Sequence, residues 1–363
     1  MSMEINSIHF YVTDAIKTSD WLRQKLGFQV VDRYQDADSL TITIAYQSIL
    51  LIVSAPLSDR SPIAHYLARH AEGVADLSFR VRDLEQFQEL SANQVLQPKQ
   101  NKADVAYMVI RGWGILKHSL IAGDSSDRYY VLSNGKLRRL SDSNFRVPNL
   151  FHWQEVDHAV LNVAQGELTQ AVNYYQELFG WQVQQTFDIS TERSGLFSQA
   201  LRDQTGKIQF NINEPTTQNS QIQQFLDCNR GSGIQHLALR SSNLLRDVAA
   251  MRNLGVPFLA IPLVYYLRLQ KKLKSNQLVL SSEIWRQLQK QQILVDWHSN
   301  RPSAILMQIF TKPIFSQPTF FLEFIERQQQ AQGFGAGNFQ ALFAAVEEEQ
   351  LAVSDEKWPV TSF

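Results

Sequence analysis

The chain of 363 residues contains a weak internal repeat, and this repeat constrains the fold more than any other feature. Each copy has an apolar strand-like segment, a helical pattern and then a glycine, at 8–15, 19–26 and Gly27 in the first copy and at 156–163, 168–179 and Gly180 in the second. A glycine directly after a helix is typical of the left-handed residue that ends it. Self-similarity at a long period indicates a duplicated domain.

The repeat continues in a second pair of segments and in the strands around them. Gly73-Val-Ala-Asp-Leu-Ser-Phe-Arg-Val resembles Gly233-Ile-Gln-His-Leu-Ala-Leu-Arg-Ser. Alternating apolar positions predict further strands at 40–45, 48–53 and 207–212. We therefore expect an α+β fold, with βαβββ units forming curved, barrel-like mixed sheets in two tandem domains, 1–145 and 150–363. Polar residues and proline cluster near the boundary, at 140–153. Chance likeness of two unrelated α+β domains is the alternative.

Three polar residues interrupt apolar strand-like segments of the second half: His158, His236 and Glu323. An unpaired imidazole or carboxylate is costly to bury, so each needs a reason to lie there. Two imidazoles and one carboxylate form the facial triad that suits non-haem Fe(II) and leaves coordination positions open. If the three converge, they predict an oxygen-activating metal site.

The first half lacks such a set. By the same alignment His9 stands where the second copy has His158, and Asp76 stands where it has His236. The segment 117–122 has no acidic residue to match Glu323. We expect a degenerate, metal-free half in which His9 is a hydrogen-bonded core residue.

Bulk properties narrow the class of protein. A formal net charge of −1 gives no basic excess for nucleic acid or an anionic membrane surface. No apolar run is long enough to span a bilayer, and no secretory signal is visible. The single cysteine, Cys228, excludes intrachain disulfides and is interpreted as a packing residue. We expect a cytoplasmic protein.

Six short motifs occur in order in the second half: Asn213-Glu-Pro, Ser220-Gln-Ile, Gly233-Ile-Gln-His-Leu-Ala-Leu, Leu306-Met-Gln-Ile-Phe-Thr-Lys-Pro, Phe321-Leu-Glu-Phe-Ile-Glu-Arg and Gly333-Phe-Gly-Ala-Gly-Asn-Phe. With them the chain resembles 4-hydroxyphenylpyruvate dioxygenase, a two-domain family of the vicinal-oxygen-chelate superfamily. The resemblance covers nearly the full length. It departs from the family at Asn211, where proline is usual, and in the segment 260–305.

The resemblance implies tandem vicinal-oxygen-chelate domains and one Fe(II) per chain, held by His158, His236 and Glu323. It implies conversion of 4-hydroxyphenylpyruvate and O₂ to homogentisate and CO₂, in tyrosine catabolism or in prenylquinone and tocopherol synthesis. It also implies a homo-oligomer, a dimer or a tetramer. The alternatives are a 4-hydroxymandelate synthase, which uses the same substrate, and a non-catalytic binding protein of this fold.

The resemblance also predicts the residues that bind the substrate: Ser198, Asn213, Gln221, Gln235, Gln308, Phe310, Phe321, Phe334, Asn338 and Phe339. Among these Gln308, Asn213 and Gln235 are also expected to assist catalysis. Gln235 is next to His236, so an unbroken strand would point it to the opposite face unless a bulge intervenes. Asp157 precedes His158, and for the same reason we expect it at a surface or turn; the alternative is a role in supporting the metal ligand His158.

The end of the chain predicts a lid. Asn338 is a suitable helix N-cap, and apolar residues follow it at helical spacing. Glycines at 333, 335 and 337 give the approach to this helix conformational freedom. We expect the helix to close over the metal site and exclude water; the alternative is an ordinary terminal helix.

Overall fold

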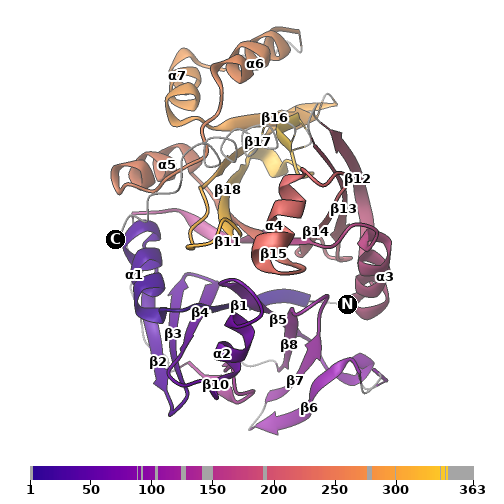
Figure 1. Cartoon of the computed structure of the whole chain (residues 1–363). Helices are drawn as coiled ribbons and strands as arrows, with labels where there is room; N and C mark the ends of the chain where they lie inside the picture. The colour runs from indigo at the N-terminus through magenta and orange to yellow at the C-terminus, as the bar shows by residue number, and fades with distance from the viewer. Residues whose placement is uncertain are drawn as a thin grey trace.

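The computed structural model describes residues 3–87, 89–90, 93–102, 105–123, 128–140, 150–190, 194–275, 280–298, 300–335, 337–339 and 341. Its strands form two eight-stranded curled sheets, one from each half of the chain, which lie one above the other (Figure 1). A short two-stranded sheet accompanies the first of them.

The first sheet has the order β2-β3-β4-β1-β5-β8-β7-β6 and consists of β1 (Met3–Tyr11), β2 (Gln29–Gln35), β3 (Ser39–Tyr46), β4 (Ile49–Pro56), β5 (Gly73–Val81), β6 (Val95–Lys102), β7 (Val105–Arg111) and β8 (Lys117–Ala122). Between them lie α1 (Ala15–Leu26), α2 (Pro62–Leu67) and the short 3-10 helix η1 (Glu85–Phe87). The two-stranded sheet pairs β9 (Tyr129–Val131) with β10 (Leu137–Arg139).

The second sheet has the order β12-β13-β14-β11-β15-β18-β17-β16 and consists of β11 (Trp153–Asn162), β12 (Gln182–Ser190), β13 (Gly195–Arg202), β14 (Gln209–Pro215), β15 (Gly233–Ser241), β16 (Leu294–His298), β17 (Arg301–Phe310) and β18 (Phe321–Arg327). Its helices are α3 (Leu168–Phe179), α4 (Gln221–Asn229), α5 (Leu244–Asn253), α6 (Leu263–Ser275) and α7 (Ser282–Gln291), with the 3-10 turn η2 (Gln328–Gln330) near the end.

The two sheets have the same topology, strand for strand, which confirms the predicted duplication and the α+β class with βαβββ units. In each half the two central strands pair antiparallel, β1 with β5 and β11 with β15. Each central strand also has a parallel neighbour. The sheets are therefore mixed, as expected, and each curls around one concave face.

The glycines that follow the repeated helices end them as predicted. Gly27 has φ +76° and Gly180 has φ +69°, both in the left-handed region. Each donates its backbone N–H back into the last turn, to Arg23 O and Gln176 O respectively. A residue with a Cβ would be strained at these positions.

Four β-bulges decide which side chains face the concave surfaces. Asn6 and Asp157 are extra residues in β1 and β11, at equivalent places in the two halves. Ala75 and Gln235 are extra residues in β5 and β15, again at equivalent places. An extra residue restarts the alternation of a strand, so the side chains beyond it point to the other face than an unbroken period of two predicts.

The bulges correct the alignment of the two copies. Counted from the bulges, Ser7 corresponds to His158, and His9 corresponds to Val160. Asp76 corresponds to His236, as expected. The predicted match of His9 with His158 was wrong by two residues. His9 is a buried core residue, as predicted, and its ring Nε2 lies 2.7 Å from Ser54 Oγ.

The concave face of the first sheet is filled by the chain itself. Side chains of the β9–β10 hairpin form hydrophobic clusters with those of the sheet: Val105, Tyr107, Val109, Ile121, Tyr129, Val131 and Leu137 in one, and Ala45, Leu50, Ile52, Tyr130, Leu132 and Leu140 in the other. Asn6 Nδ2 also donates a hydrogen bond of 3.0 Å to Tyr129 O in this hairpin. The second sheet keeps a pocket at the same place.

The two halves share one continuous core. Phe79 of the first sheet packs edge-on against Phe179 of α3, with ring centroids 5.3 Å apart. Trp153 stacks on Phe324 of β18 at 4.8 Å, directly behind the concave face. The predicted boundary between domains 1–145 and 150–363 stays a prediction, because residues 141–149 lie outside the described residues.

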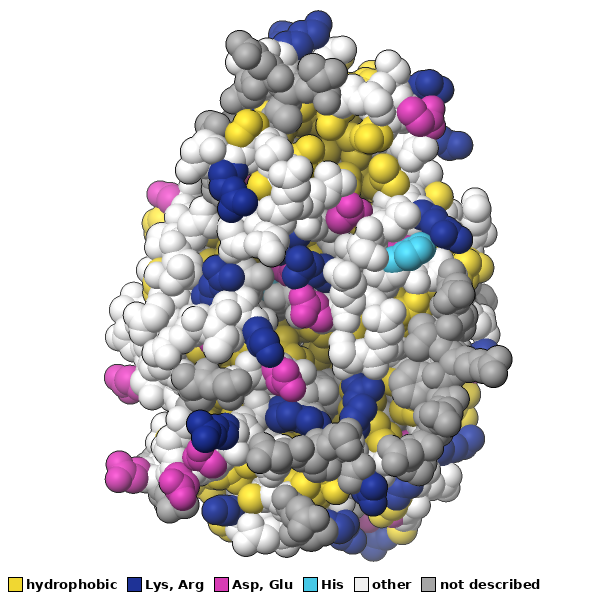
Figure 2. Space-filling model, turned by 180° about the vertical axis from the view of Figure 1, so that it is seen from behind, with side chains coloured by type: hydrophobic (Ala, Val, Ile, Leu, Met, Phe, Trp, Pro, Cys, Tyr) yellow, Lys and Arg dark blue, Asp and Glu magenta, His cyan; other side chains and the backbone are white. Residues whose placement is uncertain are grey.

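The surface carries mixed charge. On the face drawn in Figure 2, lysine and arginine side chains are interspersed with acidic ones. Among the described helices none is long and apolar enough to cross a membrane.

Candidate active site

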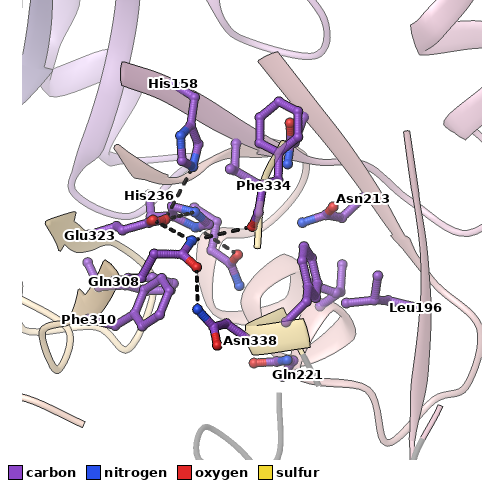
Figure 3. Close-up of a pocket in the computed structure, with 16 residues that line it drawn as sticks. His158, Leu196, Asn213, Gln221, His236, Gln308, Phe310, Glu323, Phe334 and Asn338 are labelled. Carbon is purple, nitrogen blue, oxygen red and sulfur yellow. Dashed lines mark hydrogen bonds and ion pairs between the residues drawn. The ribbon is translucent and has the colours of Figure 1, made fainter. Parts of the chain in front are cut away.

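Three side chains from separate strands meet on the concave face of the second sheet. His158 lies on β11, His236 on β15 and Glu323 on β18, and all three are buried. Glu323 Oε2 lies 3.2 Å from His158 Nε2 and 3.5 Å from His236 Nε2. Figure 3 shows the three side chains pointing toward one another. The sequence prediction that they converge is confirmed by these distances.

The electrostatics of this cluster follow from burial and proximity. Burial alone would raise the pKa of Glu323, but the two imidazoles outweigh it and lower that pKa to about 2. Burial would lower the pKa of His158, but Glu323 and Asp157 raise it to about 9. For His236 burial prevails, and its pKa falls below the usual value.

Asp157 is buried beside His158, contrary to the prediction of a surface or turn position. It is the bulged residue of β11, so it and His158 face the same side of the sheet. Asp157 Oδ1 lies 2.9 Å from His158 Nδ1. Because an ionised carboxylate only accepts hydrogen bonds, Nδ1 is the donor and Nε2 is directed at Glu323.

Gln235 plays the same part for the second histidine. It is the bulged residue of β15, and its Oε1 lies 3.3 Å from His236 Nδ1. The bulge foreseen as an exception is therefore present, and Gln235 lies on the pocket side. With both Nδ1 atoms paired, the two Nε2 atoms both point to Glu323, where they can share a ligand with its carboxylate.

These donors fit a divalent metal ion. One ligand atom from each of the three residues lies within 4.8 Å of the others. Metal–ligand bonds of about 2.0–2.2 Å place neighbouring ligands of an octahedral ion about 3 Å apart, close to the observed spacing. The set is two imidazoles and one carboxylate on one side of the ion, which suits non-haem Fe(II).

The pocket beside this cluster contains all but one of the predicted substrate-binding residues. Its walls are formed by His158, Val160, Leu196, Asn211, Asn213, Gln221, Ile222, Gln235, His236, Gln308, Phe310, Phe321, Glu323, Phe334, Asn338 and Phe339. The exception is Ser198, which is fully buried on β13 opposite Asn213 and does not line the cavity.

A series of hydrogen-bonded side chains joins Glu323 of the triad to the C-terminal segment around Asn338. Gln308 Nε2 donates to Glu323 Oε1 at 2.9 Å and to Phe334 O at 3.3 Å. Gln308 Oε1 accepts from Asn338 Nδ2 at 2.9 Å (Figure 3). Asn338 Oδ1 in turn accepts from the hydroxyl of Tyr265 at 2.9 Å. This series positions Glu323 and holds the C-terminal segment over the pocket.

Aromatic rings form the flat walls of the pocket. Phe321 stacks on His236 with centroids 4.7 Å apart, and Phe334 meets His158 edge-on at 5.4 Å. Phe339 stacks on Phe187 at 5.4 Å. The cavity has a volume of only about 30 Å³. Small-molecule pockets usually measure roughly 300–1,000 Å³, so an aromatic ligand requires these walls to move.

Two buried oxygens in the pocket wall, Asn211 Oδ1 and Asn213 Oδ1, have no hydrogen-bond partner among the described residues. The same is true of Ser198 Oγ, which lies opposite Asn213 outside the cavity lining. Such atoms are rare in folded proteins and mark places where a ligand or water completes the set. Asn211 was missed as a pocket residue in the sequence prediction. It lies two residues before Asn213, so the period of two along a strand would have found it.

The predicted lid helix falls mostly outside the described residues. Residues 337–339 and 341 are helical, and nothing further along the chain is described. Closure by a helix after Asn338 therefore stays a prediction.

Comparisons with known proteins identify the family of this chain. The family model for the Glyoxalase/Bleomycin resistance protein/Dioxygenase superfamily matches residues 155–267. The fold and the clustered triad thus define a dioxygenase of the vicinal-oxygen-chelate type. The 4-hydroxyphenylpyruvate dioxygenase of Caenorhabditis elegans is 31% identical over 94% of this chain and 91% of its own. The chain belongs to the 4-hydroxyphenylpyruvate dioxygenase family and is an oxidoreductase of the non-haem iron dioxygenase class.

Two further relatives complete the comparison. An uncharacterized protein of Synechocystis, slr0090, is 36% identical over 97% of this chain and 100% of its own. A solved structure of a triple mutant of 4-hydroxymandelate synthase from Streptomyces coelicolor superposes with a TM-score of 0.84. It is 26% identical, and the match covers 96% of this chain and 98% of that one.

Proposed function

We propose that this chain converts 4-hydroxyphenylpyruvate and O₂ to homogentisate and CO₂ at one Fe(II) ion. The observation that carries the proposal is the triad of His158, His236 and Glu323 beside a pocket with aromatic walls and unpaired polar atoms. Relatives that bear the name of this activity match the chain over nearly its full length.

His158 Nε2, His236 Nε2 and one oxygen of Glu323 would hold the iron. When bound, Fe(II) supplies coordination sites for the 2-oxo acid and for O₂, and the redox chemistry of the reaction. Asp157 and Gln235 keep each imidazole in the tautomer that offers Nε2. Gln308 holds the carboxylate of Glu323 at its other oxygen.

The remaining side chains would bind and orient the substrate. Phe310 and Phe339 offer flat faces for the ring, and Gln221, Asn213 and Gln308 offer amides. The orphaned oxygens near Asn213 fit a phenolic hydroxyl, which can both donate and accept. Closure of the segment around Phe334 and Asn338 would exclude water from the metal.

A 4-hydroxymandelate synthase is the second candidate, and the structural likeness to such an enzyme favours it. It would use the same substrate and triad but hydroxylate the benzylic carbon. The two reactions differ in where the bound ring lies relative to the metal. Product chemistry therefore separates them.

The deciding experiment loads the protein with Fe(II) without oxygen, adds 4-hydroxyphenylpyruvate and O₂, and identifies the product by chromatography. Homogentisate supports the proposal, and 4-hydroxymandelate supports the second candidate. His158→Ala should abolish both turnover and Fe(II) binding, whereas His65→Ala, at an exposed position on α2, should change neither. Failure of Fe(II) to bind would contradict both candidates.

The pathway and the homo-oligomeric state remain predictions from the resemblance, and the cytoplasmic location remains a prediction from the bulk properties of the sequence. Analytical ultracentrifugation tests the second directly, with a dimer or a tetramer expected.

A further inference from the structure

Asn211 lines the pocket at a position where the family that the sequence resembles usually has proline. It lies on β14, is 2% exposed, and lines the cavity. Its Oδ1 is enclosed and has no hydrogen-bond partner among the described residues. The proline usual at this place would offer no polar side chain at all. The amide is therefore an addition to the pocket.

The side chains next to Asn211 in the sheet offer no hydrogen bond to its amide. In the sheet it lies between Val160 of β11 and Ala200 of β13, and both of these side chains are apolar. The next pair on the same face of these strands is Ser198 opposite Asn213. Ser198 Oγ and Asn213 Oδ1 are also unpaired, so three orphaned polar groups adjoin one wall. Burial of so many unpaired groups is costly, which indicates that a ligand completes them.

The position of Asn211 relative to the metal cluster indicates which part of a ligand it would meet. His236 pairs with Val160 from the other side, so Asn211 lies two strands from His236. Adjacent strands are about 4.8 Å apart, which separates the two Cα atoms by about 10 Å. An acid that binds the metal by its oxo-acid group would direct its far, aromatic end to this wall.

We propose that Asn211 is a specificity-determining residue that hydrogen-bonds a ring hydroxyl of the aromatic ligand. A hydroxyl suits this place because it donates and accepts, and so pairs with the amide in either orientation. The consequence is discrimination against aromatic 2-oxo acids without the hydroxyl. This inference rests on the proposed function, since it assumes that the acid group binds at the metal.

The test compares two ligands, 4-hydroxyphenylpyruvate and phenylpyruvate, bound to the Fe(II)-loaded protein without oxygen and measured by calorimetry. Asn211→Leu replaces the amide with an apolar group of similar size. It should lower the preference for the hydroxylated acid about tenfold, which is what loss of one hydrogen bond costs, and leave phenylpyruvate binding within about threefold. If Asn211→Leu fails to fold, Asn211→Ala measures the same ratio.

Thr319→Val is the matched control, because Thr319 Oγ1 is also a buried unpaired atom but lies away from the pocket walls. It should leave the ratio unchanged. An unchanged ratio in Asn211→Leu, or an equal loss for both ligands, would overturn the inference while the proposed function stands. If the wild-type protein binds neither acid, both the inference and the proposed function are wrong.

Discussion

Asp157 and Arg327 form a buried ion pair next to His158 of the triad. Arg327 Nε lies 2.7 Å from Asp157 Oδ2, and Arg327 Nη2 lies 2.6 Å from Asp157 Oδ1. The remaining Nη1 donates to the backbone carbonyls of Ala331 and Gly333, at 3.1 and 2.7 Å. One guanidinium thus connects the carboxylate that orients His158 with the segment that leads to the pocket wall. The pair holds the pKa of Asp157 well below its usual range.

Arg327→Met should destabilise the protein by about 3–5 kcal/mol, because it leaves the charge of Asp157 buried and unpaired. Asp157→Asn should keep the fold better but weaken metal binding by about 10–100-fold, since His158 loses its charged partner. Chemical denaturation measures the first effect and metal titration the second.

The control for this pair is Arg240→Ala. Arg240 of β15 and Glu155 of β11 also form an ion pair, with Nη1 and Oε1 2.8 Å apart, but both side chains are partly exposed. Its loss should change stability by less than about 1 kcal/mol. Equal effects of Arg327→Met and Arg240→Ala would contradict the role assigned to the buried pair.

Gly335→Ala should disrupt the series of hydrogen-bonded side chains over the pocket. A Cβ at Gly335 would overlap Gln308 Oε1 and come within 3.1 Å of Leu306 Cδ2. Gln308 must then move, so we expect binding of the aromatic acid to weaken by about tenfold or more. Anaerobic calorimetry with the Fe(II)-loaded protein measures it.

Gly180→Ala separates crowding from backbone strain. Gly180 has φ +69° and Gly335 has φ +71°, so alanine is similarly strained at both, but a Cβ at Gly180 meets nothing within 4 Å. Gly180→Ala should cost roughly 1–2 kcal/mol of stability without changing ligand affinity. If both variants bind the acid like wild type, Gln308 is not held in place as described.

Fe(II) should stabilise the fold through the triad. At a concentration 100 times its dissociation constant, a ligand that binds only the folded state adds about 2.7 kcal/mol. We expect a rise in Tm of several degrees with Fe(II), reversed by a chelator. Glu323→Gln should abolish this rise and His65→Ala should preserve it. A rise that survives in Glu323→Gln would place the metal elsewhere.

Acid should destabilise the interface between the halves through His118. This residue is fully buried, with Nδ1 2.8 Å from Leu77 O and Nε2 3.1 Å from the hydroxyl of Tyr175. Burial lowers its pKa to about 4, against about 6.5 in the unfolded chain. The unfolded state therefore binds the proton first as pH falls. The free energy of unfolding should therefore fall by up to about 3 kcal/mol as the pH falls from 6.5 to 4.

His118→Gln should flatten this part of the curve of unfolding free energy against pH, because glutamine keeps hydrogen-bonding groups but does not titrate. A wild-type slope that persists in His118→Gln would assign the acid sensitivity to another group, such as His9, whose pKa is lowered to about 3.

The sequence by itself determined the duplication, the helix-ending glycines and the convergence of His158, His236 and Glu323. These three features depend on local sequence patterns and on polar residues within apolar strands, both of which are visible in a single sequence. It also determined most of the pocket, since all the predicted substrate residues except Ser198 line it.

Only the tertiary structure decided which way the residues around the triad point. Asp157 and Gln235 reach the Nδ1 atoms of His158 and His236 because each is an extra residue in its strand. A single chain read with a period of two does not reveal where the pairing of two strands slips. The same slip in β1 moved the true counterpart of His158 from His9 to Ser7. Register is a property of two strands together, and it becomes defined only when they pair.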